Sequence, residues 1–331
     1  MKKLLSILLV VAVLLSVFAI AASAAENVTK KVSDAKASFY LAYPKAIGKD
    51  VPFYWTWPNA VQWILQYVLF GFAWMLAMLA VALFGDALTP FSFSQMDLHA
   101  RLSPPMSSLS HWLGTDELGR DVWSRLISSI RISLMVAFFS TLLSSLIGLL
   151  LGFLAAHFRS WVEQAVQALI DFQAAMPFMI IALSVLAFFG NSLTLLICLM
   201  GFYGWERVAR ITRSLTLAAS EQGYAAAVRD IGASPWRVYT LHVLPNIAST
   251  IIVSITLTFP EVILLESSLS FLGLGVQPPM SSLGNMVGYG REYLQSAPWI
   301  LLAPSAVIVL TTFSISMVGD WLRDRLDPKL R

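Results

Sequence analysis

Apolar runs alternate with polar segments along the chain from residue 61 to the carboxyl terminus. Most of the runs have the ~20 residues that an α-helix needs to cross ~30 Å of hydrocarbon. The run at 192–205 is shorter, and we expect its helix to continue through Glu206 to Leu217 into water. We therefore predict an all-α integral membrane protein with six membrane-spanning core helices. The runs cover residues 61–84, 132–157, 168–190, 192–205, 247–271 and 299–318.

The amino-terminal part of the chain has a different pattern. Residues 1–24 begin Met-Lys-Lys, continue with an apolar run and finish Ala-Ala-Ser-Ala-Ala, which is typical of a secretory signal peptide. The apolar run is also near the lower length limit for a span, so an extra hydrophobic helix is the alternative. A misassigned start codon is a third interpretation. Residues 25–60 form a polar linker with five lysines.

Composition supports the membrane class. Of the 331 residues, 57% are hydrophobic and only 12% are charged, whereas soluble domains have about a quarter charged. The net charge of +3 does not indicate nucleic acid, because cytoplasmic loops of membrane proteins carry an excess of Lys and Arg. The lipid bilayer is therefore the expected surrounding. The single cysteine, Cys198, excludes a disulfide within the chain.

The positive charges also predict an orientation. Loops on the side of residues 206–240 hold ten Lys and Arg, and the loops on the other side hold five. This two-to-one bias places residues 206–240 and the carboxyl terminus in the cytoplasm. We expect a multi-pass protein of the cell (inner) membrane.

The polar stretch 220–246 interrupts the apolar runs and has the pattern of two short helices. Tyr224, Ala227 and Val228 recur at helical spacing, so one face of the first helix is apolar. Gly232 is a typical left-handed stop, and Ser234 followed by a proline predicts the start of a second helix. Pro245 is expected to end that second helix. An exposed apolar face on a polar segment predicts docking on another protein.

This stretch resembles the signature loop of permease subunits of ATP-binding-cassette importers. Ala226-Ala227-Val228 stands where the family has an EAA triplet, Gly232 matches its glycine, and Leu244-Pro245 matches its hydrophobic-proline pair. The acidic residue of the triplet is absent at Ala226. The resemblance implies that the stretch contacts a separate ATPase through Glu221, Tyr224, Ala226, Ala227, Val228, Asp230, Gly232, Ala233, Ser234, Leu244 and Pro245.

Three further strings are similar to the C-type permease subunit of the dipeptide/oligopeptide branch. Residues 111–131 contain LGTDELGRDV, residues 266–285 contain ESSLSFLGLGVQPP, and residues 319–328 read GDWLRDRLDP. From the residues alone, Gly114 and Gly119 predict a turn, and Asp121 predicts a helix start. The resemblance implies a type I importer transmembrane domain: residues 61–130 form the first core span and an external segment, and residues 131–331 form the permease domain with a cytoplasmic coupling loop at 206–246.

The resemblance further implies a transporter subunit that is not an enzyme. The chain has no GxxxxGK[ST] loop to hold ATP, so the ATPase is expected to be another polypeptide. The implied partners are a second permease subunit in a heterodimer, one or two ATP-binding subunits and an extracytoplasmic solute-binding protein. The implied cargo is di- or oligopeptides, with nickel chelates or glutathione as alternatives. We expect no cofactor.

Two carboxylates in apolar runs are candidates for the translocation path. Glu261 and Glu266 are costly to ionise within a membrane, so each is a functional candidate. Glu261 faces either the path or a packing partner, and Glu266 either serves the path or lies near the outer mouth, where water would reach it. A proton-driven secondary transporter would instead titrate Asp171 or Glu261, but the inverted repeats expected of that class are not found. His111 and His242 are not spaced with other ligands, so no metal site is expected.

Overall fold

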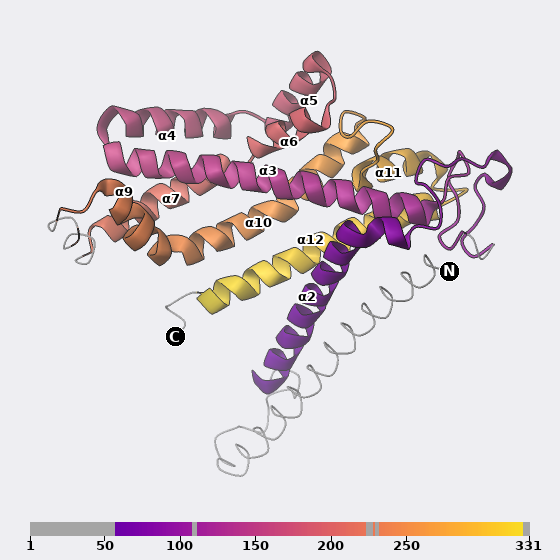
Figure 1. Cartoon of the computed structure of the whole chain (residues 1–331), viewed down its shortest axis with the longest axis horizontal. Coiled ribbons are helices and arrows are strands. Elements are labelled where there is room, and N and C mark those ends of the chain that lie inside the picture. The colour runs from indigo at the N-terminus through magenta and orange to yellow at the C-terminus, as the bar shows by residue number, and fades with distance from the viewer. Residues whose placement is uncertain (1–56, 108–110, 223–227, 229–231, 327–331) are drawn as a thin grey trace, which may run out of the picture.

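The computed structural model describes residues 57–107, 111–222, 228 and 232–326. Figure 1 shows the helix Val122–Phe158 lying along the length of the molecule and the helix Trp57–Leu88 running steeply away from it. The described residues form helices and connecting loops, with one isolated bridge between Thr115 and Asp121. The helices are α2 (Trp57–Leu88), α3 (Val122–Phe158), α4 (Ser160–Ala175), α5 (Phe178–Phe189), α6 (Leu193–Gly201), α7 (Trp205–Ser220), α9 (Pro235–Val238), α10 (Leu244–Phe271), α11 (Leu283–Gly290) and α12 (Trp299–Leu326).

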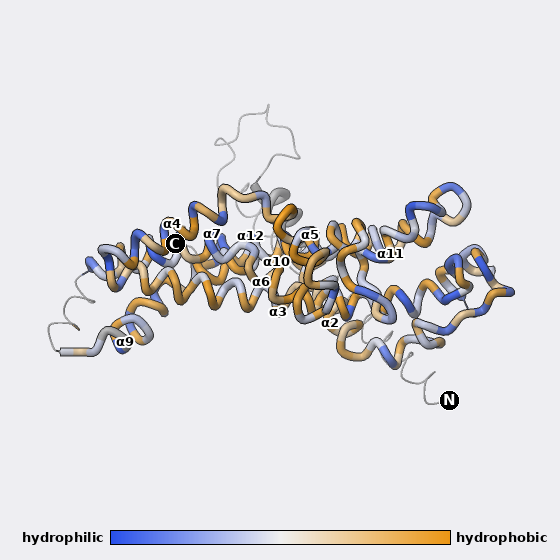
Figure 2. The backbone as a smooth tube through the Cα atoms, turned by 90° about the horizontal axis from the view of Figure 1, so that it is seen from above, coloured by the Kyte–Doolittle hydropathy of each residue, from blue (hydrophilic) through white to orange (hydrophobic). Residues whose placement is uncertain are grey.

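Four helical segments are long and apolar enough to cross a membrane. They are α2 from Val68, α3, α10 together with the turn before it from Tyr239, and α12. A bent pair, α4 and α5, makes a fifth crossing if the two count as one span. Figure 2 shows hydrophobic stretches midway along the molecule and hydrophilic segments toward its two ends, as a membrane domain requires.

The third and fourth predicted runs are not continuous helices. Pro177 divides the third run, and α4 and α5 meet there at 85°. The residue before a proline disfavours the helical conformation, which explains why α4 ends at Ala175. In the fourth run, Gly204 has a left-handed φ of 81° and separates α6 from α7. Together, α6 and α7 follow α3 along its length, and α6 alone has only nine residues.

Two glycines of α3 let α7 approach closely. A β carbon on Gly148 would lie 2.7 Å from the carbonyl oxygen of Trp205, and one on Gly152 would lie 2.7 Å from the carbonyl oxygen of Ala209. No side chain fits at these distances. The two glycines, four residues apart on one face of α3, therefore permit this close helix packing.

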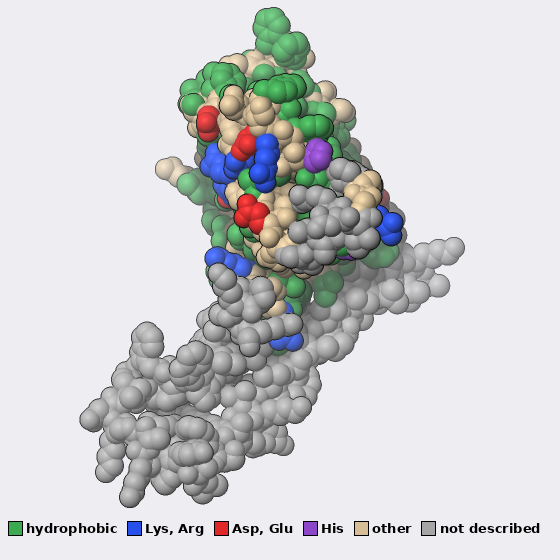
Figure 3. Space-filling model, turned by 90° about the vertical axis from the view of Figure 1, so that its left-hand side faces the viewer, with side chains coloured by type: hydrophobic (Ala, Val, Ile, Leu, Met, Phe, Trp, Pro, Cys, Tyr) green, Lys and Arg blue, Asp and Glu red, His purple; other side chains and the backbone are tan. Residues whose placement is uncertain are grey.

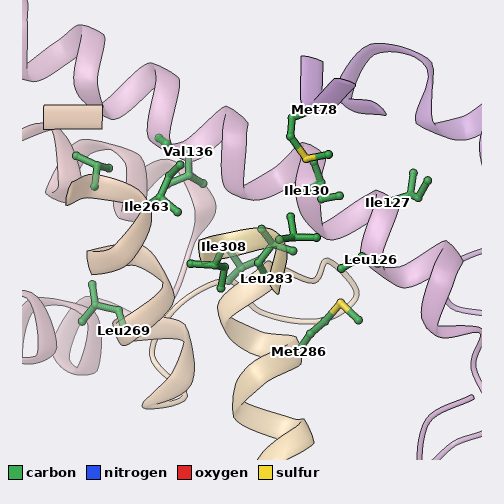
Figure 4. Close-up of a cluster of buried hydrophobic side chains, with 14 of the residues drawn as sticks. Met78, Leu126, Ile127, Ile130, Val136, Ile263, Leu269, Leu283, Met286 and Ile308 are labelled. Atoms are coloured by element: carbon green, nitrogen blue, oxygen red, sulfur yellow. The ribbon is translucent and has the colours of Figure 1, made fainter. Parts of the chain in front are cut away.

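The main apolar core joins α2, α3, α10, α11 and α12. Figure 4 shows side chains from these helices meeting in one cluster. Ile130 and Val136 come from α3, Ile263 from α10, Met286 from α11 and Ile308 from α12. Because the cluster includes the extramembrane helix α11, the segment 272–290 is fixed to the bundle.

Residues 89–121 and α11 lie together at the right-hand end of the molecule in Figure 1. Asp121 caps α3 by accepting a hydrogen bond from the backbone N–H of Ser124 at 2.8 Å, as predicted. The predicted turn glycines both have left-handed φ angles, 76° at Gly114 and 70° at Gly119. The buried carboxylate of Asp116 contacts the guanidinium groups of Arg120 and Arg125, which holds the segment against α3.

Candidate functional site: the polar hairpin and the intramembrane carboxylates

We call the stretch 220–246 the polar hairpin, and its described residues lie at the opposite end of the molecule from residues 89–107 and 111–121 (Figure 1). Of this hairpin, the structure describes residues 220–222, 228 and 232–246. Four predicted ATPase-contacting residues, Tyr224, Ala226, Ala227 and Asp230, lie outside the described residues. Their roles stay predictions.

Gly232 reverses the chain between the two parts of the hairpin. Its φ is 86°, a conformation that L-amino acids with a side chain rarely adopt. The N–H of Ala233 donates a hydrogen bond of 3.3 Å to the carbonyl oxygen of Val228, five residues earlier. A bond of this span with glycine at the reversal is the Schellman arrangement that ends helices. The predicted glycine stop is confirmed.

The second helix begins where the sequence predicts. It starts at Pro235, and the hydroxyl of Ser234 accepts a long hydrogen bond of 3.4 Å from the N–H of Arg237. The carbonyl oxygen of Ser234 accepts a second bond, of 3.0 Å, from Val238. These are the groups that an N-cap residue offers.

The prediction that Pro245 ends this helix is wrong. Residues Tyr239–Val243 form a π-helical turn, in which Leu244 donates its N–H to the carbonyl of Tyr239, and α10 follows directly. Pro245 is then the second residue of α10, within a continuous run of helical residues to which it contributes no backbone N–H. The wide turn therefore joins the hairpin to α10 in one helical path.

The inner side of the hairpin packs on the chain itself. Its apolar cluster contains Ala219 of α7, Val238, Val243, and Ile247 and Ile251 of α10, all buried. Val228, Ala233 and Leu244 are half-buried against this cluster, as are Leu149 and Phe153 of α3. Part of the apolar face that the sequence predicts therefore packs against other helices of the same chain. Val228 belongs to this part, so it contributes to the packing of the hairpin as well as to any docking.

The outer side of the hairpin mixes charged, small and apolar groups. Leu241, which the sequence motif does not mark, is 60% exposed on the π-helical turn. Figure 3 views this end of the molecule and shows basic and acidic side chains gathered on it. The exposed residues of the described hairpin include Glu221, Gly232, Ser234, Arg237, Leu241, Pro245 and Asn246.

Glu261 of α10 forms an ion pair with Arg207 of α7. Nη1 of Arg207 lies 2.9 Å from Oε1 and 3.1 Å from Oε2 of Glu261. The side chains are 47% exposed for Arg207 and 36% for Glu261, so the pair stands on an open face shared by α7 and α10. Arg207 could not be predicted from the sequence as the partner of Glu261, because no local spacing links two residues that are 54 positions apart.

Glu266 has a different environment. Its side chain is fully buried, so the alternative in which water reaches it is wrong. Its carboxylate accepts hydrogen bonds from Ser133 of α3 at 3.3 Å and from Ser270 at 2.6 Å. The Ser133 hydroxyl also accepts the N–H of Leu283, the first residue of α11, at 3.1 Å. Glu266 therefore joins α3, α10 and α11.

No group of three or more His, Cys, Asp or Glu side chains suited to a metal ion occurs in the described ranges. The site is thus made of two parts. One is the hairpin at one end of the bundle, and the other is the Arg207–Glu261 pair on the open face.

Comparisons with known proteins identify the family of the chain. Residues 148–331 match the family model described as binding-protein-dependent transport system inner membrane component. The glutathione transport system permease protein GsiD of Pectobacterium atrosepticum is 35% identical over 257 residues, covering 78% of this chain and 85% of that protein. The dipeptide transport system permease protein DppC of Bacillus subtilis is 36% identical over 258 residues, covering 78% and 80%.

A third relative and a solved structure extend these matches. The dipeptide transport system permease protein DppC of Alkalihalophilus pseudofirmus is 35% identical over 251 residues, covering 76% of this chain and 82% of that protein. Among solved structures, a chain of the MetNI methionine ABC transporter in an inward-facing form matches with a TM-score of 0.50 and 18% identity. The match covers 61% of this chain and 96% of that chain. At this identity, it supports the fold only.

Proposed function

Because the chain belongs to the family of binding-protein-dependent transport system inner membrane components, we propose that it forms half of the membrane path of an ATP-driven peptide importer. The polar hairpin docks on a separate ATPase. The observation that carries this proposal is the hairpin itself: its reversal at Gly232 and its helix start at Ser234 fit the family's signature loop.

The hairpin is built to pass force into the membrane. Its inner side is fastened to α3, α7 and α10 by buried apolar contacts, and the π-helical turn continues into α10. Displacement of the hairpin by the ATPase would therefore move these helices together. Such rigid-body movement is a common way to switch a protein between two states.

The path lies on the face that carries Arg207 and Glu261, and a second permease subunit closes it. Charged side chains within apolar segments face a protein interior or a water-filled cavity, because exposure to lipid is costly. The 36–47% exposure of this pair within the single chain therefore indicates that a partner subunit or water covers it. The end with α11 faces an extracytoplasmic solute-binding protein, and the hairpin and carboxyl terminus are cytoplasmic.

The cargo is di- or oligopeptides, and glutathione is the second candidate. Two of the relatives are named as dipeptide permeases, and a third is named as a glutathione permease. Both cargos are short peptides with free termini. Nickel chelates, the other alternative that the family resemblance implies, find no support among these relatives.

Cross-linking from the hairpin tests the docking. Cys198, the single cysteine of the sequence, is first replaced by serine, and Leu241→Cys is introduced. We expect a bifunctional maleimide to join this position to the co-expressed ATPase. Leu294→Cys is the matched control, because Leu294 is 51% exposed at the opposite end of the molecule and Leu241 is 60% exposed. If only the Leu294→Cys variant captured the ATPase, the hairpin would not be its docking site.

Uptake by the reconstituted complex tests the cargo. Proteoliposomes containing this chain, its partner permease, the ATPase and the binding protein should take up labelled dipeptide when ATP is supplied. Uptake of glutathione in preference to dipeptides would assign the second candidate. ATP-independent uptake driven by a proton gradient would contradict the proposal altogether.

A further inference from the structure

A pocket of about 390 Å³ opens where α2 ends and α3 begins. Its apolar wall includes Phe91, Phe93 and Met280, and its polar rim includes Asp86 of α2 and Arg131 of α3. Neither the polar hairpin nor the Arg207–Glu261 pair lies near it, since it is at the end that carries residues 89–121 (Figure 1). The pocket therefore needs an explanation of its own.

The charged rim offers a carboxylate and a guanidinium side by side. Oδ2 of Asp86 lies 3.2 Å from Nη1 of Arg131. The side chains are nevertheless 96% and 54% exposed, so both groups present most of their polar atoms to a ligand. Exposed pairs of this kind contribute little to folding, and a ligand with one positive and one negative group can bind both at small cost.

An exposed apolar stripe leads away from this rim. Leu76, Leu79 and Leu83 are 52%, 53% and 66% exposed, and their spacing places them on one face of α2. Asp86 continues the same face at the next helical position. From Leu76 to Asp86 the helix rises ~15 Å, which is about half of the ~30 Å hydrocarbon core of a bilayer. The stripe thus has the length of one leaflet.

We propose that this pocket binds the headgroup of a phospholipid with a primary ammonium group, such as phosphatidylethanolamine. The ammonium group donates hydrogen bonds to Asp86, the phosphate accepts them from Arg131, and one acyl chain lies along the leucine stripe. An anionic headgroup without an amine would be repelled by Asp86. The trimethylammonium of phosphatidylcholine has no N–H to donate, so the carboxylate selects against it as well.

Native mass spectrometry of the full chain, purified in detergent and supplied with defined lipids, tests the proposal. Wild-type protein should retain phosphatidylethanolamine in preference to phosphatidylglycerol and phosphatidylcholine. Asp86→Asn should lower that preference by about twofold to fivefold, the range for one exposed ion pair. Arg131→Gln should weaken retention of all three lipids. The matched controls are Asp320→Asn and Arg323→Gln, which remove exposed charges of α12 and should change neither quantity.

Three results would overturn this inference. Equal retention of the three lipids by the wild type would remove the selectivity. Unchanged lipid preference in Asp86→Asn, with the variant shown to be folded by its helical circular dichroism, would remove the role of the carboxylate. Displacement of bound phosphatidylethanolamine by millimolar dipeptide would assign the pocket to a zwitterionic peptide and not to a lipid. None of these results depends on ATP-driven uptake, so the proposed transport function is tested separately.

Discussion

Nη1 of Arg207 lies within 3.1 Å of both carboxylate oxygens of Glu261, which joins α7 to α10 on an open face of the molecule. A carboxylate in an apolar run therefore has a cationic partner from a distant part of the chain. This pairing offsets part of the cost of placing either charge in the membrane. It also leaves both groups accessible from the side where a second subunit would sit.

Reversal of one charge of this pair should reduce ATP-driven uptake. In Glu261→Arg, two guanidinium groups face each other, and in Arg207→Glu, two carboxylates do. We expect each single variant to lose about tenfold or more of the transport rate, the effect of ~1.4 kcal/mol on a barrier. The double variant, which restores opposite charges, should recover part of it. Uptake in proteoliposomes measures all three, and a double variant no better than either single one would show that the two residues are not coupled.

Gly232→Val should weaken association with the ATPase while membrane insertion stays normal. Among the described residues, no atom lies within 4 Å of the added β carbon, so the cost comes from the left-handed φ, about 1–2 kcal/mol for a residue with a side chain. Gly190→Val is the matched control, because Gly190 has a φ of 84° and equally open surroundings between α5 and α6. Co-purification of the ATPase measures the effect. Equal loss of the ATPase in both variants would mean that general strain, and not the hairpin, is responsible.

Glu266→Ala should destabilise the protein by about 2–4 kcal/mol, because it leaves buried serine hydroxyls without their acceptor. Glu266→Gln keeps an acceptor oxygen of the same reach, and we expect a loss below about 1.5 kcal/mol. Thermal unfolding in detergent, followed by circular dichroism, compares the two. If Glu266→Gln stopped transport at unchanged stability, the carboxylate would have a role beyond joining α3, α10 and α11.

Gly152→Ala should destabilise the contact between α3 and α7 by about 1–3 kcal/mol, the usual range for overpacking. The new β carbon would lie 2.7 Å from the carbonyl oxygen of Ala209, a backbone atom that cannot turn aside. Leu150→Ala, on the exposed side of the same helix at 60% exposure, should cost below about 0.5 kcal/mol in the same unfolding measurement. A Gly152→Ala variant as stable as wild type would contradict this close packing.

Asp116→Ala should cost about 3–5 kcal/mol, because it leaves the buried guanidinium of Arg125 without its counter-charge. The same carboxylate also accepts the backbone N–H groups of Leu118 and Arg120, each at 2.9 Å. The exposed pair gives the contrast: Asp86→Asn should cost less than about 1 kcal/mol. The unfolding midpoints of the two variants measure this difference in stability. Equal midpoints would show that burial does not determine how much each ion pair contributes to stability.

Local chemistry along the chain predicted the helix boundaries well where one residue decides them. The start of α3 at Asp121, the reversal at Gly232 and the start of α9 after Ser234 all follow from capping groups or a positive φ. The apolar runs likewise predicted α2, α3, α10 and α12 as spans. These features depend on neighbours within a few residues, which a sequence displays directly.

Features that depend on distant neighbours could not be predicted in the same way. The break at Pro177 is a bend of 85°, and no local rule gives that angle. The π-helical turn before Pro245 lies where the hairpin packs on α3 and α7, a contact between distant parts of the chain that no local pattern displays. Glu266 is likewise buried beside Ser133 and Ser270, and Ser282 contacts Ser270 from a third part of the chain, a juxtaposition that no local pattern displays.

The close contact of α3 with α7 at Gly148 and Gly152 has a mechanical consequence. With backbone pressed against backbone, neither helix can slide past the other without steric overlap, so the two act as one rigid lever. A push on α7 near Ala219 would then reach the far end of α3, where Arg125 is anchored to Asp116. A displacement of the end near Ala219 would thus move the end near Arg125 without any change in helix shape between them.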